Sequence, residues 1–422
     1  MGTTTVTETT LRDEVETWLT EHWPAGKELP RKEWLEQVVD ARWAVPTWPT
    51  EWYGRGLDGE TAEVIAQEFR RAGAPGAGQD KHNLWANTVL AFGTDELKQQ
   101  FVRRLLIDDV KMCLLYSEPG AGSDLAGLQT RADRDGDEWV VNGQKVWTSG
   151  GKEAEFGMLI ARTSWDVPKH QGISFFWCPM DQPGVEVRPI RQITGEAHFN
   201  EVFLDDVRVP AHHLVGPLDG GWRVLQTALA YERSVMGDMA RGPRSGQRPP
   251  DAPADDRAGE AEDAGDAEVE FRQASSGPGA AEVDLWALAR ERGRDQDPTI
   301  RQAIAKVHEL RKVNAWNGLR AKAELEQGSS SPILSLGKLA MSRILHEGAH
   351  VQRLIVGNEA LLYGRKHPLG DDANFLSLNA FFTSIGGGTD QIQRNIIGER
   401  VLGLAKEPEV DRDIPFRQAR RS

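Results

Sequence analysis

The hydrophobic periodicity of the chain changes twice along its length, and this change restricts the possible folds more than any other feature of the sequence. From Leu11 to about Val110, apolar residues recur at three- and four-residue steps, which predicts helices. Between about Cys113 and Val215 the pattern becomes a series of short β-rich runs separated by turn residues. From Gly221 onward the helical period returns in four long segments. The sequence therefore predicts a small β-domain between two helical regions.

An α+β architecture with three domains follows from this order. We expect an N-terminal helical domain over 1–112, a central β-barrel or sandwich over 113–215, and a C-terminal four-helix bundle over 216–422. The central strands do not alternate with helices, which argues against a doubly wound dinucleotide-binding fold. A chain of 422 residues also has enough interior to enclose a cofactor.

Charge and composition argue against several classes of protein. The formal net charge of -14 repels phosphate backbones, and no apolar run approaches the roughly 18 residues that a transmembrane helix needs. We therefore expect no nucleic-acid partner and no integral membrane segment. The start, MGTTTVTETT, lacks the basic and apolar regions of a signal peptide, so a cytoplasmic protein is expected. Cys113 and Cys178 lie in apolar stretches without metal-ligand spacing, which predicts buried free thiols and no metal site.

The stretch from about Gly242 to Glu282 differs from the rest of the C-terminal part. It is rich in Pro, Gly, Ala and acidic residues and has few apolar residues to offset the entropy of ordering. We expect it to be a mobile loop that joins two helices of the bundle. A functional lid is the less favoured alternative.

Two short motifs in the β-rich part carry groups suited to a flat polar ligand. The run YSEPGAGSD, from Tyr116 to Asp124, exposes backbone N–H groups and hydroxyls, but it lacks the GxxxxGK[ST] pattern of a phosphate loop. Further on, NGQKVWTS places Trp147 and Ser149 after an expected hairpin turn at Asn142-Gly143, on one face of an extended strand. Taken alone, a Gly-rich run such as the first motif is more often an ordinary turn. The second motif is equally compatible with a core Trp beside a surface Ser.

These motifs and three later ones occur in the order found in the acyl-CoA dehydrogenase family. The chain contains YSEPGAGSD, NGQKVWTS, FLDDVRVP, ALAYERSVMG and IGGGTDQIQRNIIGERVLGL, and it thereby resembles that family over nearly its whole length. The resemblance implies helices, a central β-domain and a four-helix bundle, in agreement with the order predicted from periodicity. The insertion at 242–282 is the only large departure in layout.

The resemblance also implies FAD as the cofactor and assigns residues to it. Ser117 matches a hydroxyl that hydrogen-bonds the flavin ring, and Ser123 matches one near the pyrophosphate or the pantetheine arm of the substrate. Trp147 and Ser149 match the aromatic cover of the flavin and the hydroxyl that faces its N5 atom. The other residues that the resemblance places at the cofactor are Tyr116, Gly122, Thr148, Thr389, Asp390 and Gln391.

The catalytic base is where the sequence departs from the commonest family pattern. Many members carry a Glu in the run before the last helix, but here that run is Gly386-Gly387-Gly388-Thr389, without a proton acceptor. A branch similar to isovaleryl-, long-chain and steroid side-chain acyl-CoA dehydrogenases carries the base on the first bundle helix, where Glu232 matches. Gly387 leaves room for that carboxylate, and its N–H can donate to the thioester carbonyl. Arg233 matches an arginine near the CoA moiety.

The implied reaction converts an acyl-CoA to a trans-2-enoyl-CoA, with an electron-transferring flavoprotein as the expected electron acceptor. The resemblance implies a homodimer or homotetramer, and a heterotetramer is a further possibility. Two alternatives stay open: an acyl-CoA oxidase or flavin monooxygenase of the same fold, and a non-catalytic subunit of a heteromeric dehydrogenase. The second is suggested by the missing Glu at Gly387 and by an incomplete match to the family's adenine-contacting residues.

Overall fold

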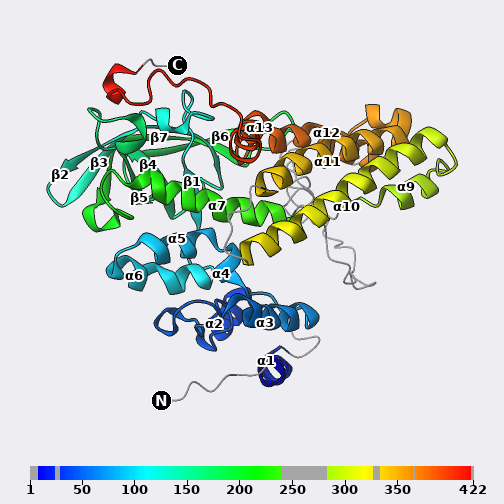
Figure 1. Ribbon diagram of the computed structural model, residues 1–422, viewed down its shortest axis with the longest axis horizontal. Coiled ribbons are helices and arrows are strands. Elements are labelled where there is room, and N and C mark those ends of the chain that lie inside the picture. Colours follow the sequence, from blue (N-terminus) through cyan, green and yellow to red (C-terminus); the bar gives the residue numbers. More distant parts are fainter. Residues whose placement is uncertain (1–7, 24–28, 240–282, 327–332, 365, 420–422) are drawn as a thin grey trace, which may run out of the picture. The chain divides into compact units, whose positions relative to one another are not determined.

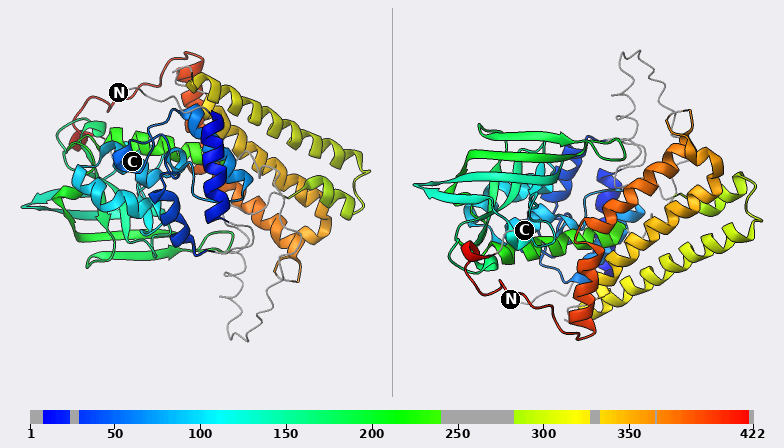
Figure 2. Two further views of the ribbon diagram at one scale, coloured as in Figure 1. Left: turned by 90° about the horizontal axis from the view of Figure 1, so that it is seen from below. Right: turned by 90° about the horizontal axis from the view of Figure 1, so that it is seen from above.

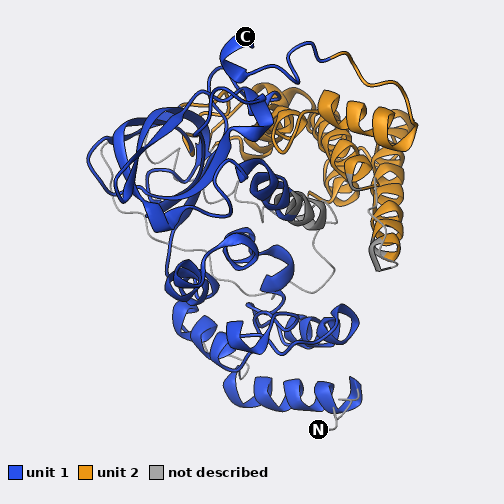
Figure 3. Cartoon of the chain, turned by 60° about the vertical axis from the view of Figure 1, so that its left-hand side comes forward, with its two compact units in different colours: residues 1–190, 199–232, 409–422 blue, residues 191–198, 233–408 orange. Residues whose placement is uncertain are grey.

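The computed structural model describes residues 8–23, 29–239, 283–326, 333–364 and 366–419 (Figure 1). The chain forms two compact units. Unit 1 contains residues 1–190, 199–232 and 409–422, and unit 2 contains residues 191–198 and 233–408 (Figure 3). The predicted domain borders at 112 and 215 both fall inside unit 1, because the N-terminal helices and the strands share one hydrophobic core.

The N-terminal part of unit 1 is helical within its described residues. Its α-helices are α1 (Glu8–His22), α2 (Arg31–Asp40), α3 (Gly59–Arg71), α4 (Gln79–His82), α5 (Leu84–Phe92) and α6 (Asp95–Leu106). Side chains that the sequence provides mark where these helices begin. The Asp58 carboxylate accepts hydrogen bonds from the first backbone N–H groups of α3, and the Thr94 hydroxyl accepts one from Leu97 N in α6.

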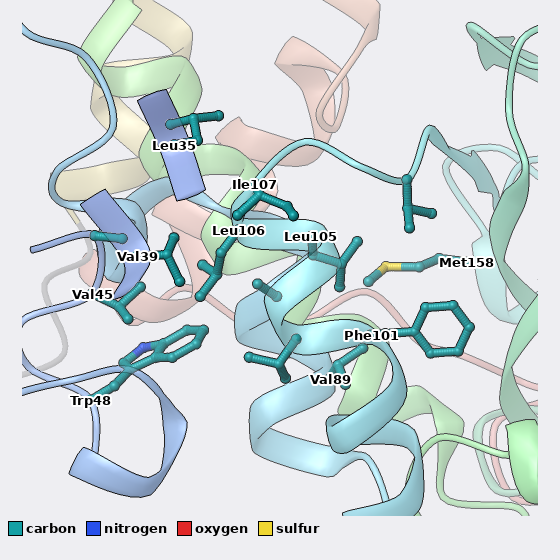
Figure 4. Close-up of a cluster of buried hydrophobic side chains, with 14 of the residues drawn as sticks. Leu35, Val39, Val45, Trp48, Val89, Phe101, Leu105, Leu106, Ile107 and Met158 are labelled. Atoms are coloured by element: carbon teal, nitrogen blue, oxygen red, sulfur yellow. The ribbon is translucent and has the colours of Figure 1, made fainter. Parts of the chain in front are cut away.

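The N-terminal helices pack directly against the strands. Figure 4 shows part of this core, with side chains from α2, α5 and α6 and with Met158 of the sheet beside Leu105 and Phe101 of α6. The Phe101 ring lies 4.9 Å from the Phe156 ring and 5.2 Å from the Trp177 ring, centroid to centroid. Val224 and Leu225 of α7 (Gly221–Met239) belong to the same buried cluster. This shared core holds the start of α7 against the rest of unit 1.

Within the described residues, seven strands form one sheet, which is strongly curled (Figure 3). The strands are β1 (Met112–Leu115), β2 (Arg131–Asp135), β3 (Glu138–Ser149), β4 (Phe156–Arg162), β5 (Ile173–Pro179), β6 (Val185–Ile190) and β7 (Phe199–Pro210). Their order is β1-β4-β2-β3-β7-β6, and β5 pairs with β4. Cys113 and Cys178 are free and buried in the core of the sheet, as predicted, and burial raises the pKa of the Cys113 thiol to about 12.

The expected hairpin turn at Asn142-Gly143 is wrong, because β3 continues through both residues. The ladder to β7 is irregular at this point, and the Asn142 side-chain amide donates to Asp206 Oδ1 at 2.9 Å. A Cβ atom on Gly143 would lie 2.3 Å from Thr130 Oγ1. Gly143 therefore marks a close approach of two chain segments at a bulge, and not a turn.

Unit 2 is built from helices in its described part. They are α9 (Leu285–Glu291), α10 (Pro298–Glu326), α11 (Ile333–Val356), α12 (Pro368–Ile385) and α13 (Asp390–Ile396), together with the end of α7. Helices α10, α11 and α12 lie side by side (Figure 2). The core of unit 2 includes Leu288, Val307 and Val351.

The expected loop at 242–282 lies outside the described residues. No helix in the described part of the chain is long and apolar enough to cross a membrane.

Candidate flavin site

The YSEPGAGSD motif forms a tight loop directly after β1. Glu118 and Ala121 close it, because the backbone N–H of each donates to the carbonyl oxygen of the other at 3.0 Å. Tyr116 is buried below the loop, where its hydroxyl donates to Met158 Sδ at 3.7 Å. Gly122 and Ser123 are exposed, and a Cβ atom added at Gly122 would meet no heavy atom within 4 Å beyond its two chain neighbours. The loop therefore offers backbone and hydroxyl groups on an open surface.

The end of β3 presents a second set of groups. Trp147 has a left-handed backbone (φ +64°) at a bulge in the ladder to β7, and its side chain is 59% exposed. Ser149 is exposed as well, whereas Thr148 is buried and its carbonyl accepts a hydrogen bond from the Asn200 side chain at 2.9 Å. The Trp147 ring contacts Phe199 edge to face at 6.1 Å between centroids. An indole and a hydroxyl thus lie uncovered together, although the strand is bulged and not regularly extended as we expected.

The YSEPGAGSD loop and the end of β3 are joined by hydrogen bonds. The backbone N–H of Val146 donates to the Ser117 carbonyl at 2.9 Å, and Lys145 Nζ donates to the Tyr116 carbonyl at 3.1 Å. Lys145 Nζ also donates to Glu118 Oε1 at 2.8 Å, with both side chains buried. Burial raises the pKa of the Glu118 carboxyl, but the charge and hydrogen bond of Lys145 outweigh that effect and hold this pKa below its ordinary value. The two predicted ligand-binding motifs form one connected structure in unit 1.

Sequence reasoning did not single out Glu118 or Lys145, although both lie inside the quoted motifs. A signal was present for Lys145. Along β3, residues 139, 141 and 145 are buried on the inner face of the sheet, so the alternation places a lysine among apolar side chains. A lysine at a buried strand position requires a carboxylate partner, and the neighbouring motif offers two acids, Glu118 and Asp124. The structure pairs Lys145 with Glu118.

The base predicted from the resemblance, Glu232, belongs to α7, as expected for a residue of the first bundle helix. Glu232 ends the 199–232 segment of unit 1, and Arg233 is assigned to unit 2. The side chains of both residues lie outside the described part of the structure. Their predicted roles therefore stay predictions.

The glycine run of unit 2 lies between α12 and α13. Gly387 and Gly388 have left-handed backbones, with φ +65° and φ +90°, which suit glycine above other residues. The Thr389 hydroxyl accepts a hydrogen bond from Ile392 N at 3.2 Å and so caps α13. The Gln393 side-chain amide donates to the Gly387 carbonyl at 3.4 Å, which leaves the Gly387 N–H outside that contact. The run is thus a defined turn at the start of a helix.

Asp390 has partners within unit 2. Its carboxylate accepts hydrogen bonds from Lys338 Nζ at 3.2 Å and from the Ser342 hydroxyl at 2.9 Å. Ser342 also bonds Ser384, which in turn bonds His346 Nε2 at 2.8 Å. Asp390 is therefore tied to α11 by a polar network that the sequence did not reveal. Gln391, next to it, is exposed.

Comparisons with known proteins agree with this architecture. Residues 4–108 match the model of the acyl-CoA dehydrogenase N-terminal domain, and residues 113–207 match that of the acyl-CoA dehydrogenase middle domain. The acyl-CoA dehydrogenase IpdE1 of Mycobacterium tuberculosis is 35% identical over 391 residues, which cover 89% of this chain and 89% of that protein. IpdE1 of Mycolicibacterium smegmatis is 33% identical over 401 residues, with the same coverage of both chains.

Solved structures show the same fold. The Tcur3481-Tcur3483 steroid ACAD is similar with a TM-score of 0.68 and 25% identity, over 95% of this chain and 98% of that chain. The ChsE4-ChsE5 complex from Mycobacterium tuberculosis is similar with a TM-score of 0.61 and 26% identity, over 96% of this chain and 100% of that chain.

The chain belongs to the acyl-CoA dehydrogenase family. It is accordingly an oxidoreductase that acts on CH–CH donors, and its family implies a flavin cofactor. The predicted order of N-terminal helices, central sheet and C-terminal helices is confirmed.

Proposed function

We propose that the chain is an FAD-dependent dehydrogenase that converts an acyl-CoA to a trans-2-enoyl-CoA. The observation that carries this proposal is the joined surface of unit 1, where Trp147 and Ser149 lie exposed at the end of β3 beside the loop of Ser117 and Ser123. An exposed indole next to hydroxyls and open backbone fits a flat heteroaromatic ring with polar edges. The residues present therefore suit a flavin.

Each residue has a proposed role at this site. Trp147 covers the ring, the Ser117 and Ser149 hydroxyls bond its polar edge, and Ser123 lies toward the pyrophosphate or the pantetheine arm. Bound FAD supplies the acceptor for the hydride that leaves the β-carbon. Backbone and side-chain groups of Tyr116, Gly122, Thr148, Thr389, Asp390 and Gln391 complete the proposed cofactor site.

Glu232 is the proposed general base, which removes the α-proton of the acyl group. The run 386–389 contains no carboxylate, so the base has to come from another element, and α7 begins in the same unit as the loop and the strand end. The Gly387 N–H donates to the thioester carbonyl, which lowers the cost of the negative charge that develops there. Arg233 binds the CoA moiety.

The Glu232→Gln variant tests this assignment. We expect anaerobic addition of acyl-CoA to bleach the flavin absorbance of the wild-type protein. The variant should retain FAD but bleach about 100- to 10,000-fold more slowly, because it lacks a proton acceptor. Glu186→Gln is a suitable control, since Glu186 is exposed on β6 and pairs with Arg188. Bleaching of the Glu232→Gln variant at the wild-type rate would show that another group is the base.

We also propose that the acyl group is bulky, branched or ring-bearing. One similar structure is named a steroid ACAD, and the chain shares with the branch quoted above a carboxylate on the first bundle helix. A panel of straight, branched and steroid-type acyl-CoAs, compared by the rate of anaerobic bleaching, ranks the substrates. Fastest bleaching by short straight chains would contradict this choice.

A second candidate function is that of a subunit in a heteromeric dehydrogenase. Two similar structures are named as pairs of proteins, Tcur3481-Tcur3483 and ChsE4-ChsE5, and the glycine run of this chain lacks an acid. Purification of the chain alone distinguishes the two functions. A yellow protein bleached by acyl-CoA supports the complete enzyme, with an electron-transferring flavoprotein as the proposed acceptor, and a colourless protein supports the subunit. Hydrogen peroxide formed at the turnover rate would instead identify an oxidase.

A further inference from the structure

Glu118 and Lys145 are the charged pair at the centre of unit 1's two ligand-binding motifs. Lys145 is fully buried and Glu118 is 8% exposed, and their charged atoms are 2.8 Å apart. Glu118 also accepts hydrogen bonds from the backbone N–H groups of Gln129 at 2.7 Å and Thr130 at 2.9 Å. Lys145 also donates to the Tyr116 carbonyl at 3.1 Å. The pair therefore joins three chain segments: the loop after β1, the residues directly before β2 and the second half of β3.

We propose that the Glu118–Lys145 pair is a positioning pair for the flavin, which sets the place of Ser117 relative to Trp147 and Ser149. Ser117 precedes Glu118 in the chain, and its carbonyl is bound by Val146, the residue between Lys145 and Trp147. Each half of the pair is thus one or two residues from a proposed flavin contact. A shift of either partner moves a hydroxyl or the indole directly.

The energetics of burial support a positioning role over a purely stabilising one. Two charges lose their hydration when they are buried, and an apolar pair of similar volume often gives equal or greater stability. An apolar pair, however, has no directional bonds and would not fix the loop against the strand. Glu118 and Lys145 instead make directional hydrogen bonds to each other and to the backbone of the neighbouring segments. Such bonds are expected of residues that support a binding surface.

The bulge at Trp147 explains why such support is needed. The left-handed backbone of Trp147 is unfavourable for a residue with a large side chain, and it persists only where neighbouring bonds hold it. The bonds on its N-terminal side come from Lys145 and Val146, and on its C-terminal side Asn200 binds the Thr148 carbonyl. Loss of the pair would remove the Lys145 bonds and so weaken the support on the N-terminal side of the bulge.

This inference rests on the proposed function, and its test uses the affinity for FAD. The variants are Glu118→Gln, Lys145→Met and the double variant Glu118→Gln/Lys145→Met. We expect each single variant to raise the Kd for FAD about 10- to 100-fold, the range typical of removing a group that orients a metal ligand. Quenching of flavin fluorescence during titration with FAD measures the Kd, and circular dichroism measures the thermal midpoint of the same samples.

The double variant separates positioning from stability. It removes both buried charges, so the thermal midpoint should recover toward the wild-type value, while the Kd for FAD stays at least about 10-fold raised. Recovery of both the midpoint and the Kd would overturn the proposal, as would single variants with a wild-type Kd. A wild-type protein that binds FAD but is not bleached by acyl-CoA would contradict only the proposed reaction, because FAD affinity still reports on the pair.

A buried carboxylate elsewhere in unit 1 provides the matched control. Glu68 of α3 is buried and pairs with Arg12 and, at 3.0 Å, with Arg71. These partners belong to the N-terminal helical part and not to either motif. Glu68→Gln should lower the thermal midpoint and leave the Kd for FAD unchanged. An equal rise of the Kd in Glu68→Gln would overturn the proposal, because it would show that FAD affinity follows overall stability.

Discussion

The backbone of Trp147 combines an unfavourable conformation with an exposed aromatic ring. At φ +64°, glycine is favoured over residues with a Cβ atom. Two variants that both lack the indole, one with and one without a Cβ atom, therefore measure the backbone strain separately from the role of the ring. We expect Trp147→Gly to be more stable than Trp147→Ala by about 1 kcal/mol, the reverse of the usual order in regular structure. Urea unfolding of the two flavin-free proteins measures the difference.

The same two variants lack the indole and should bind FAD equally weakly. Trp147→Phe keeps an aromatic ring and should retain part of the affinity. A Trp147→Ala protein as stable as Trp147→Gly would show that the backbone at this residue is not strained.

Individual residues were harder to predict from the sequence than the motifs that contain them. Trp147 and Ser149 were singled out because an indole and a hydroxyl two positions apart suit a flat ligand. Glu118 and Lys145 were not, because their pairing depends on a contact between segments 27 residues apart. Asn142-Gly143 was misread as a turn, since its local preference is overridden by the ladder between β3 and β7.

Helices and strands follow the hydrophobic periodicity closely, because burial of one face repeats along each element. The C-terminal segment has no such repeat, yet it packs on the sheet. Phe416 lies over the buried Arg162 guanidinium, 3.5 Å from ring centroid to Cζ, and its backbone N–H donates to the Val167 carbonyl. Arg162 donates to the carbonyl oxygens of Leu128, Lys169 and Ala126, and burial lowers its pKa to about 10. A contact over such a distance in sequence leaves no local signal.

Phe416→Ala should therefore destabilise unit 1. Removal of the ring uncovers a desolvated cation and should lower the free energy of unfolding by about 2 kcal/mol, the range of a buried cation–π contact. Urea unfolding followed by tryptophan fluorescence measures this loss. Arg417→Ala is the control from the same segment, because Arg417 and its partner Asp166 are exposed and their ion pair contributes roughly 0–1 kcal/mol. Equal effects of the two substitutions would contradict a specific role of the ring.

For the whole molecule, α10 carries an uncovered apolar stripe that we expect to mediate self-association. Val313, Trp316 and Leu319 are 43%, 64% and 67% exposed and recur every three residues on one face. Monomeric proteins rarely leave a contiguous apolar surface of this kind in water. Glu309 and Lys312 border the same surface with opposite charges, which suits contact with a second copy of the chain.

Trp316→Glu should reduce this association. A charge at the centre of the stripe should weaken self-association by about 2 kcal/mol or more, as expected for a buried Trp anchor. Light scattering coupled to size-exclusion chromatography over a dilution series measures the mass of the particle. Gln302→Glu adds the same charge to α10 outside the stripe, at an exposed position, and should leave the mass unchanged. A wild-type chain that is monomeric at every concentration, or a Trp316→Glu variant with the wild-type mass, would contradict self-association through α10.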